Sequence, residues 1–109
     1  MNGITTHVLD TSRGLPAPGV AVKLEKSTGE SWIVLGETST DSDGRARFSE
    51  TAPDVGVYRL TFEVGAYFEA LRCPAFYPLV QITFTIREAK HHHVPLLLSP
   101  FGYSTYRGS

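Results

Sequence analysis

Four histidines are the residues of this sequence whose types and spacing could do chemistry. His7 stands alone near the start of the chain, whereas His91, His92 and His93 are consecutive near its end. An imidazole has an unperturbed pKa of about 6.5, so it can accept or release a proton near neutral pH. Imidazole nitrogens also bind zinc. Proton transfer, metal binding and simple exposure to solvent are therefore three interpretations of these residues.

The histidines lie in segments whose apolar residues recur with period two, a pattern that is typical of β-strands. Side chains of a strand alternate between its two faces, so His91 and His93 share one face and His92 takes the other. The face of His92 is the more apolar one, which predicts that it is turned toward the core. His91 and His93 then point away from the core, toward solvent or a partner. The other residues on the predicted core face are Val94, Leu96 and Leu98.

The residues alone do not choose among the three interpretations. In segment 4–10 the alternation rule places His7 on the same face as Thr5 and Leu9. A metal site would need a third ligand from His7 or from a carboxylate elsewhere. Histidine is intermediate in burial, so a solvated histidine run is the plainest interpretation of residues 91–93.

Turn residues divide the rest of the chain into short segments of the same alternating kind. Segment 66–72 lacks Gly and Pro, contains good helix formers and is the one helix that we expect. About eight short strands and one short helix predict an all-β antiparallel sandwich. The chain length of 109 residues argues for a single domain over 1–109. The expected strands are 4–10, 20–25, 32–38, 45–48, 57–64, 79–87, 92–98 and 103–106, and segment 11–19 is an expected loop.

Composition excludes several classes of function. The formal net charge of -1 provides no basic surface for nucleic acid, and no stretch approaches the roughly 20 apolar residues that cross a bilayer. Cys73 is the single cysteine, so we expect no internal disulfide and a small, buried, apolar role for its side chain. Residues 1–4 lack a signal-peptide pattern, which favours the cytoplasm, or the periplasm if a leader was removed.

Three segments resemble the signatures of one known family. They are Ile-Thr-Thr-His-Val-Leu-Asp at 4–10, Thr-Asp-Ser-Asp-Gly-Arg at 40–45 and the whole of 93–109, which ends in Tyr-Arg-Gly-Ser. Together they resemble the 5-hydroxyisourate hydrolases of the transthyretin-like family. The similarity covers essentially the full chain in order, and the third segment is the most specific.

The resemblance implies a fold, an assembly and a reaction. The fold would be a prealbumin-like sandwich, and four copies would form a homotetramer whose active sites lie in a channel between two dimers. The reaction would add water to a ring amide of 5-hydroxyisourate and yield 2-oxo-4-hydroxy-4-carboxy-5-ureidoimidazoline in urate degradation towards allantoin. We expect no cofactor and no metal. The sequence also lacks a recognisable covalent nucleophile, phosphate loop or dinucleotide motif.

The resemblance also assigns roles to residues. His7 and His93 would supply the base and its orienting or proton-transfer partner, although the sequence does not say which is the base. Arg45 would hold the anionic substrate or stabilise the developing negative charge, although an Arg that follows a turn glycine is usually solvated. His91 is left without a role. The residues implied to bind substrate are Ser104, Tyr106, Arg107, Gly108 and Ser109.

A carrier without turnover is the alternative function, because transthyretin shares the fold. Transthyretin lacks the His, Arg and His set and the Tyr-Arg-Gly-Ser ending, and this chain has both. Two small departures from the hydrolase pattern occur. Phe-Tyr-Pro stands at 76–78 where Phe-Phe-Pro is expected, and His-His-His at 91–93 where His-Tyr-His is expected. The second departure places the polar ring of His92 on the predicted core side.

Overall fold

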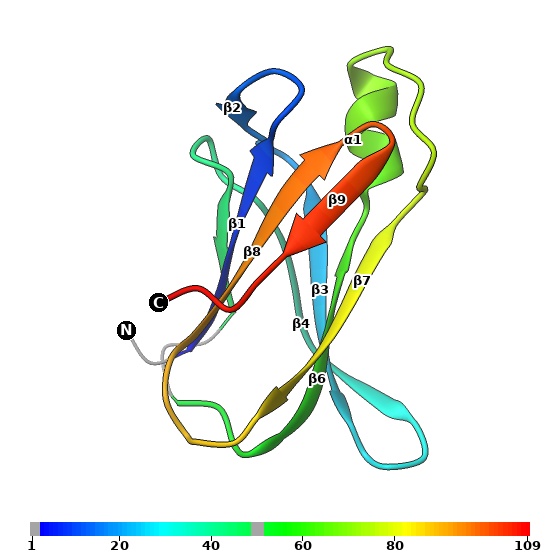
Figure 1. Ribbon diagram of the computed structural model, residues 1–109. Coiled ribbons are helices and arrows are strands. Elements are labelled where there is room, and N and C mark those ends of the chain that lie inside the picture. The colour runs from blue at the N-terminus through cyan, green and yellow to red at the C-terminus, as the bar shows by residue number, and fades with distance from the viewer. Residues whose placement is uncertain (1–2, 49–51) are drawn as a thin grey trace.

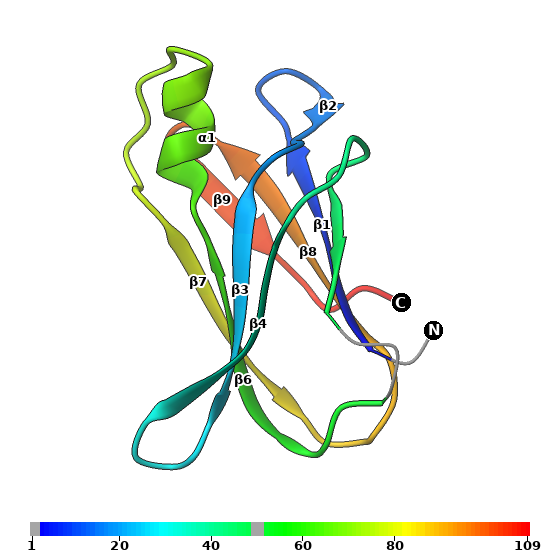
Figure 2. The same ribbon diagram turned by 180° about the vertical axis from the view of Figure 1, so that it is seen from behind.

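The structure is a computed structural model that describes residues 3–48 and 52–109. Within these ranges nine strands form two sheets that pack face to face, and the helix α1 (Val64–Ala70) lies at one end of the sandwich (Figure 1, Figure 2). The first sheet contains β1 (Ile4–Asp10), β2 (Leu15–Pro16), β5 (Arg45–Arg47), β8 (His92–Ser99) and β9 (Gly102–Thr105). The second sheet contains β3 (Ala21–Ser27), β4 (Trp32–Ser39), β6 (Gly56–Phe62) and β7 (Val80–Ile86).

The strand order is β2-β1-β8-β9 in the first sheet and β4-β3-β6-β7 in the second. Strand β5 also pairs with β1, at Thr5 to His7, whereas β2 pairs with the other end of β1 at Leu9 and Asp10. The predicted all-β antiparallel sandwich is confirmed. One pair differs in direction, because β1 and β8 run parallel. These two strands come from opposite ends of the chain, so no hairpin fixes their relative direction.

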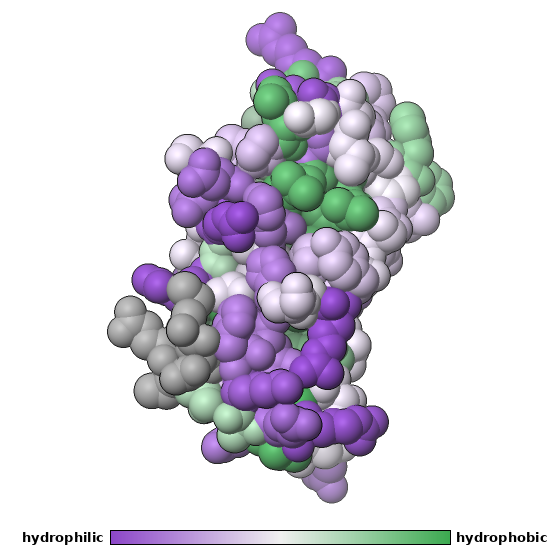
Figure 3. Space-filling model, turned by 60° about the vertical axis from the view of Figure 1, so that its left-hand side comes forward, coloured by the Kyte–Doolittle hydropathy of each residue, from purple (hydrophilic) through white to green (hydrophobic). Residues whose placement is uncertain are grey.

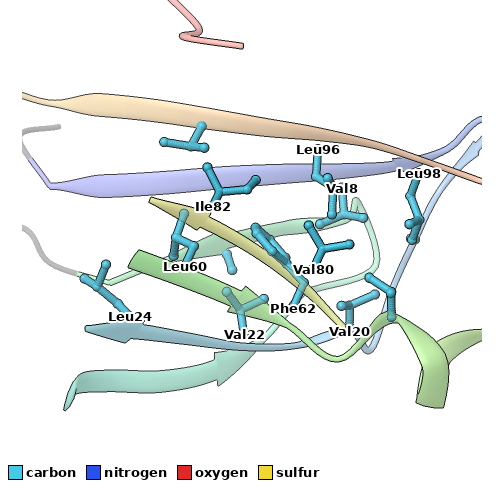
Figure 4. Close-up of a cluster of buried hydrophobic side chains, with 14 of the residues drawn as sticks. Val8, Val20, Val22, Leu24, Leu60, Phe62, Val80, Ile82, Leu96 and Leu98 are labelled. Carbon is cyan, nitrogen blue, oxygen red and sulfur yellow. The ribbon is translucent and has the colours of Figure 1, made fainter. Parts of the chain in front are cut away.

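The core lies between the two sheets and is built from alternate residues of each strand. Val8, Leu60, Phe62 and Leu96 are completely buried there (Figure 4). Burial of one such side chain contributes roughly 1.5–3 kcal/mol to folding. Because the inner residues of β1 and β8 are fixed by this packing, the residues between them must point to the outer face of the sheet.

Most strand bounds differ from the expected ones by one or two residues, and two other segments also differ. The segment predicted as a loop, 11–19, contains the short strand β2. The helix begins and ends two residues before the predicted 66–72. Arg72 lies outside it because its φ of 54° is left-handed, and the amides of Arg72 and Cys73 donate to the carbonyls of Glu69 and Phe68. These two bonds form a Schellman motif, which closes the helix.

Two further expectations concern single segments. Cys73 is half-buried and packs against the core, so it is less enclosed than predicted. Met1 and Asn2, from the segment without a leader pattern, lie outside the described residues. Among the residues that are described, no helix has the length and apolar character needed to cross a bilayer.

Candidate active site

The outer face of the first sheet collects the histidines that the sequence singled out. Along β1 the burial alternates, with Thr6 and Val8 buried and Thr5 and His7 only partly so. On β8, His92 is turned toward the core and His93 away from it, as predicted. His92 is buried, and its Nδ1 lies 2.7 Å from the carbonyl oxygen of Lys90, to which it donates. The buried ring of His92 therefore has a polar partner.

The turn before β5 brings Arg45 to the same face. The amide of Gly44 donates to the carbonyl of Asp41 at 2.9 Å, and the carbonyl of Gly44 accepts from the amide of Val8 at 2.7 Å. Gly44 has a φ of 76°, and a Cβ atom on it would collide with the carbonyl oxygen of Val8. Only glycine therefore allows this turn to lie so close to β1.

Strand β5 then pairs directly with β1, and His7 lies opposite Arg45. Directly opposite residues of an antiparallel pair have Cβ atoms roughly 4.5–5.5 Å apart, on the same face of the sheet. Arg45 is exposed, as expected for a residue after a turn, but the pairing aims its charge at the histidine face. The structure thus brings His7 and Arg45 together.

A pocket of about 540 Å³ opens on this face. Figure 3 views the molecule from the side on which both chain ends lie, and hydrophilic side chains gather across the lower half of that view. The pocket itself offers basic groups, hydroxyl groups and one carboxylate to a polar ligand. The residues that line the pocket are Thr5, Thr6, Asp41, Arg45, Ala46, Arg47, His91, His93 and Ser109.

His93 is held from two sides. Its Nδ1 lies 2.8 Å from the hydroxyl oxygen of Thr5, the residue opposite it in the β1–β8 pairing. On the other side Gly108 packs against the ring, and its amide donates to the His93 carbonyl at 2.8 Å. A Cβ atom on Gly108 would lie only 2.5 Å from Cδ2 of His93. The His93 ring therefore fits between the hydroxyl of Thr5 and the backbone of Gly108.

The electrostatics of the face keep His93 neutral. Partial burial lowers the pKa of His93 below its ordinary value of 6.5, and charge repulsion from Arg45, and from His91 and His7 when they are protonated, lowers it further. The pKa of Asp41 is lowered as well, below its ordinary value of 3.8, because the amide of Arg45 donates a hydrogen bond to its carboxylate. At neutral pH the pocket therefore contains a neutral imidazole, a carboxylate and a guanidinium.

His7 differs from His93 in its hydrogen bonding. Its Nε2 lies 2.9 Å from the carbonyl oxygen of Asp43, which can only accept. The proton of a neutral His7 ring is therefore on Nε2, and Nδ1 keeps the lone pair. His7 is not among the residues that line the pocket, but it borders the pocket through its neighbour Arg45.

The five C-terminal residues expected to bind substrate lie in three places. Ser109 lines the pocket and Gly108 contacts the His93 ring, and both views show the end of the chain passing β8 toward β1 (Figure 1, Figure 2). Ser104 pairs with Leu97, so it lies on the outer face farther along β8. Tyr106 and Arg107 line a different cavity of about 270 Å³, beside β7. Their contact with substrate stays a prediction.

Thr5, Asp41 and Arg47 are among the lining residues that sequence reasoning did not identify. The signal for Thr5 was present, because it shares the face of His7 in an alternating strand. Arg47 follows Arg45 by two residues, so the same alternation places both on one face. Asp41 belongs to the segment 40–45 that carries the family resemblance, but it was given no role. None of the described residues form a group of three or more His, Cys, Asp or Glu that could hold a metal ion.

Comparison with known proteins gives a consistent family match. The model of the HIUase/Transthyretin family matches residues 4–108. A 5-hydroxyisourate hydrolase of Caulobacter vibrioides is 47% identical over 115 aligned positions, which cover 100% of both chains. The structure of the Klebsiella pneumoniae 5-hydroxyisourate hydrolase superimposes with a TM-score of 0.89 at 41% identity and covers 100% of both chains.

The fold is shared with a binding protein as well. Sea bream transthyretin, solved in complex with thyroxine, superimposes with a TM-score of 0.90 at 29% identity and covers 97% of this chain and 94% of its own. The backbone therefore does not separate hydrolase from carrier, and the residues of the site must do so.

Proposed function

The chain belongs to the HIUase/transthyretin family, and we propose that it is the hydrolase of that family, which opens the ring of 5-hydroxyisourate. The observation that most supports this function is the pocket in which His93 and Arg45 meet, with His7 opposite Arg45. The 41% to 47% identity to hydrolases over the whole chain supports the same conclusion. The relation to transthyretin, at 29%, is more distant.

His93 is the general base in this proposal. A base must be unprotonated when substrate and water arrive, and the lowered pKa of His93 meets that condition at neutral pH. His93 takes a proton from water at Nε2, and the resulting hydroxide forms a C–O bond with the ring carbonyl carbon. The imidazolium then returns the proton to the ring nitrogen as the C–N bond breaks. A positioned base of this kind contributes roughly 10²- to 10⁴-fold in rate.

Arg45 stabilises the negative charge that develops on the carbonyl oxygen. Its planar guanidinium offers several donors in a fixed geometry, which suits an oxyanion or the anionic substrate. His7 assists from β1, where it lies directly opposite Arg45 on the same face of the sheet. Because its Nε2–H is held by the Asp43 carbonyl, Nδ1 is the nitrogen free to contact substrate or water.

A homotetramer completes the site in this proposal. The pocket lies on an outer face, where bulk water would screen the charge of Arg45 and that of the imidazolium formed on His93 during the reaction. A second subunit placed over that face would exclude water and strengthen those interactions. Large apolar side chains elsewhere on the surface, among them Phe76 and Phe101 at about 70% exposure, are available to subunit contacts.

The decay of the ultraviolet absorbance of freshly made 5-hydroxyisourate tests the function. We expect rapid decay with the protein, unchanged by chelator, and loss of most activity in His7→Ala, Arg45→Ala and His93→Ala while the tetramer persists. Arg87→Ala, at an exposed arginine after β7, is the matched control and should retain activity. Normal turnover in two of the three site variants contradicts the site.

Two other results point to the alternative functions. A protein that binds ligand in the pocket without accelerating decay is a carrier of the transthyretin kind. A protein that retains stoichiometric zinc after dialysis and loses its function with chelator is a metal protein. Either result excludes the cofactor-free hydrolase.

A further inference from the structure

The Thr5 hydroxyl lies between two imidazole rings. Its oxygen is 2.8 Å from Nδ1 of His93 and 2.8 Å from Nε2 of His91. The two rings are nearly parallel, with centroids 6.4 Å apart and planes 29° apart. The β1–β8 pairing sets Thr5 directly opposite His93, and all three side chains point away from the core. The three groups therefore form a chain of two hydrogen bonds along the pocket wall.

The chemistry of a hydroxyl couples the two rings. Thr5 has one hydrogen, so it can donate to only one of the two nitrogens, and it must accept from the other. Each ring therefore constrains the other, because the two nitrogens that face Thr5 cannot both be unprotonated while both bonds exist. The position of the proton on His93 depends on what His91 accepts or donates.

We propose that Thr5 is a positioning residue that accepts the Nδ1–H of His93 and donates to Nε2 of His91. This arrangement keeps Nε2 of His93 unprotonated, and Nε2 is the nitrogen that takes the proton from water. The proposal rests on the function proposed above and on His93 as its base. His91 is the acceptor that makes the arrangement possible, because it takes the single hydrogen of Thr5.

The opposite arrangement would leave the base inactive. If Thr5 donated to Nδ1 of His93, the proton of the neutral ring would be on Nε2, and no lone pair would face water. A general base commonly needs a third group that fixes its tautomer, and loss of that group is costly even when the geometry is unchanged. In this molecule the third group is a hydroxyl backed by a second imidazole.

Thr5→Val tests the proposal, because valine has nearly the same shape but no hydroxyl. We expect kcat to fall roughly 10- to 100-fold while KM changes less than about twofold, since only the fraction of His93 in the correct tautomer is active. Thr5→Ser restores the hydroxyl and should recover kcat to within about threefold. Thr38→Val makes the same change at an exposed position of the second sheet and should leave kcat unchanged.

The ¹⁵N chemical shifts of the His93 ring, at a pH where it is neutral, provide a readout that a purely steric role would not move. In the unaltered protein they should show Nδ1 protonated, and in Thr5→Val the proton should redistribute toward Nε2. In His91→Phe the Thr5 hydrogen loses its acceptor, so the same redistribution should occur although Thr5 is intact. A His93 that carries its proton on Nε2 in the unaltered protein overturns the proposal.

The kinetic and spectroscopic results also separate this proposal from the proposed function. If the unaltered protein turns over substrate but Thr5→Val keeps full kcat, or Thr5→Ser is as slow as Thr5→Val, the positioning role is wrong and the hydrolase remains. If the unaltered protein does not turn over substrate, the proposed hydrolase function is wrong. The catalytic role of the His93 tautomer, which rests on that function, is then wrong too.

Discussion

The outer faces of the two sheets both present charged side chains, but they arrange them differently. On the second sheet Arg59 and Glu25 lie opposite each other and form an ion pair at 2.9 Å, and the guanidinium of Arg59 lies 4.2 Å from the ring centre of Trp32. On the first sheet Arg45 is paired with His7, a group that can itself become positive. The second sheet joins two opposite charges in a nearly buried pair, whereas the first sheet holds titratable imidazoles beside the guanidinium of Arg45.

This difference indicates which face stabilises the fold and which does chemistry. The ion pair of Arg59 and Glu25 neutralises its own charges. On the first sheet, partial burial and then the charge of Arg45 lower the pKa of His93. Perturbed titratable groups in a pocket are typical of functional sites. On the first sheet Arg45 disfavours a charge on His93, whereas on the second sheet Arg59 and Glu25 attract each other.

The largest effect that would sharpen this comparison comes from Gly108→Ala. The added Cβ atom would lie 2.5 Å from Cδ2 of His93, so either the ring or the end of the chain must move. We expect activity to fall roughly 10- to 100-fold, because misplacement of a base by about 1 Å has effects of this size. The thermal midpoint should change little, since this segment lies beyond the last strand.

Gly102→Ala is the matched control for that variant. At Gly102 the nearest atom to an added Cβ is Oγ of Ser99 at 3.7 Å, an ordinary contact. Its activity should equal that of the unaltered protein. Equal activity in both alanine variants would mean that the close fit of Gly108 against His93 is not used.

The sequence predicted the strands and their faces well because packing imposes period two. Thr6, Val8 and Leu96 are inside and His7 and His93 outside, as alternation requires. Helix bounds were less accurate. Alternation and composition do not show that Arg72 adopts a left-handed conformation, which is uncommon for a residue with a side chain.

The site was only partly predictable, because strand pairing between distant segments decides it. Residues 7, 45 and 93 had been grouped by resemblance, and the pairing of β1 with both β5 and β8 explains physically why they lie on neighbouring strands of one sheet. The same pairing brings Thr5 beside His93 across 88 residues of sequence. No local pattern encodes that contact. Alternation along a strand likewise could not predict the cavity that Tyr106 and Arg107 line.

A smaller effect, on stability alone, is expected on the second sheet. Glu25→Gln removes the charge that faces Arg59 while it keeps the shape of the side chain, which is only 7% exposed. We expect the free energy of unfolding to fall by about 1–2 kcal/mol in chemical denaturation, because a charge-assisted hydrogen bond is replaced by a weaker one. Ring-opening activity should not change.

Glu88→Gln provides the control for that variant, because Glu88 and Lys90 form an exposed pair at 3.2 Å. Exposed pairs contribute little, so the free energy of unfolding should change by about 0.5 kcal/mol or less. If Glu25→Gln lowers activity as much as the site variants do, the division of labour between the two faces is wrong.

The smallest effect concerns the pKa of His93, which NMR titration can follow without any turnover. Arg45→Gln removes a positive charge that disfavours the imidazolium, so the pKa of His93 should rise. Arg47→Gln removes a charge from the same strand and the same pocket. Arg47 is not among the groups that lower the pKa of His93, so this control should leave the titration unchanged.

The sign of the shift links this titration to activity and to stability. Because His93 must be neutral to act, kcat/KM should rise with pH through the pKa of His93, and the lowered pKa extends activity to pH values below 6.5. The unfolded chain binds the proton more readily, so folding becomes less favourable as the pH falls through about 6.5 and toward the lower folded value. If the pKa of His93 is unchanged or falls in Arg45→Gln, the charge of Arg45 does not lower the pKa of the base.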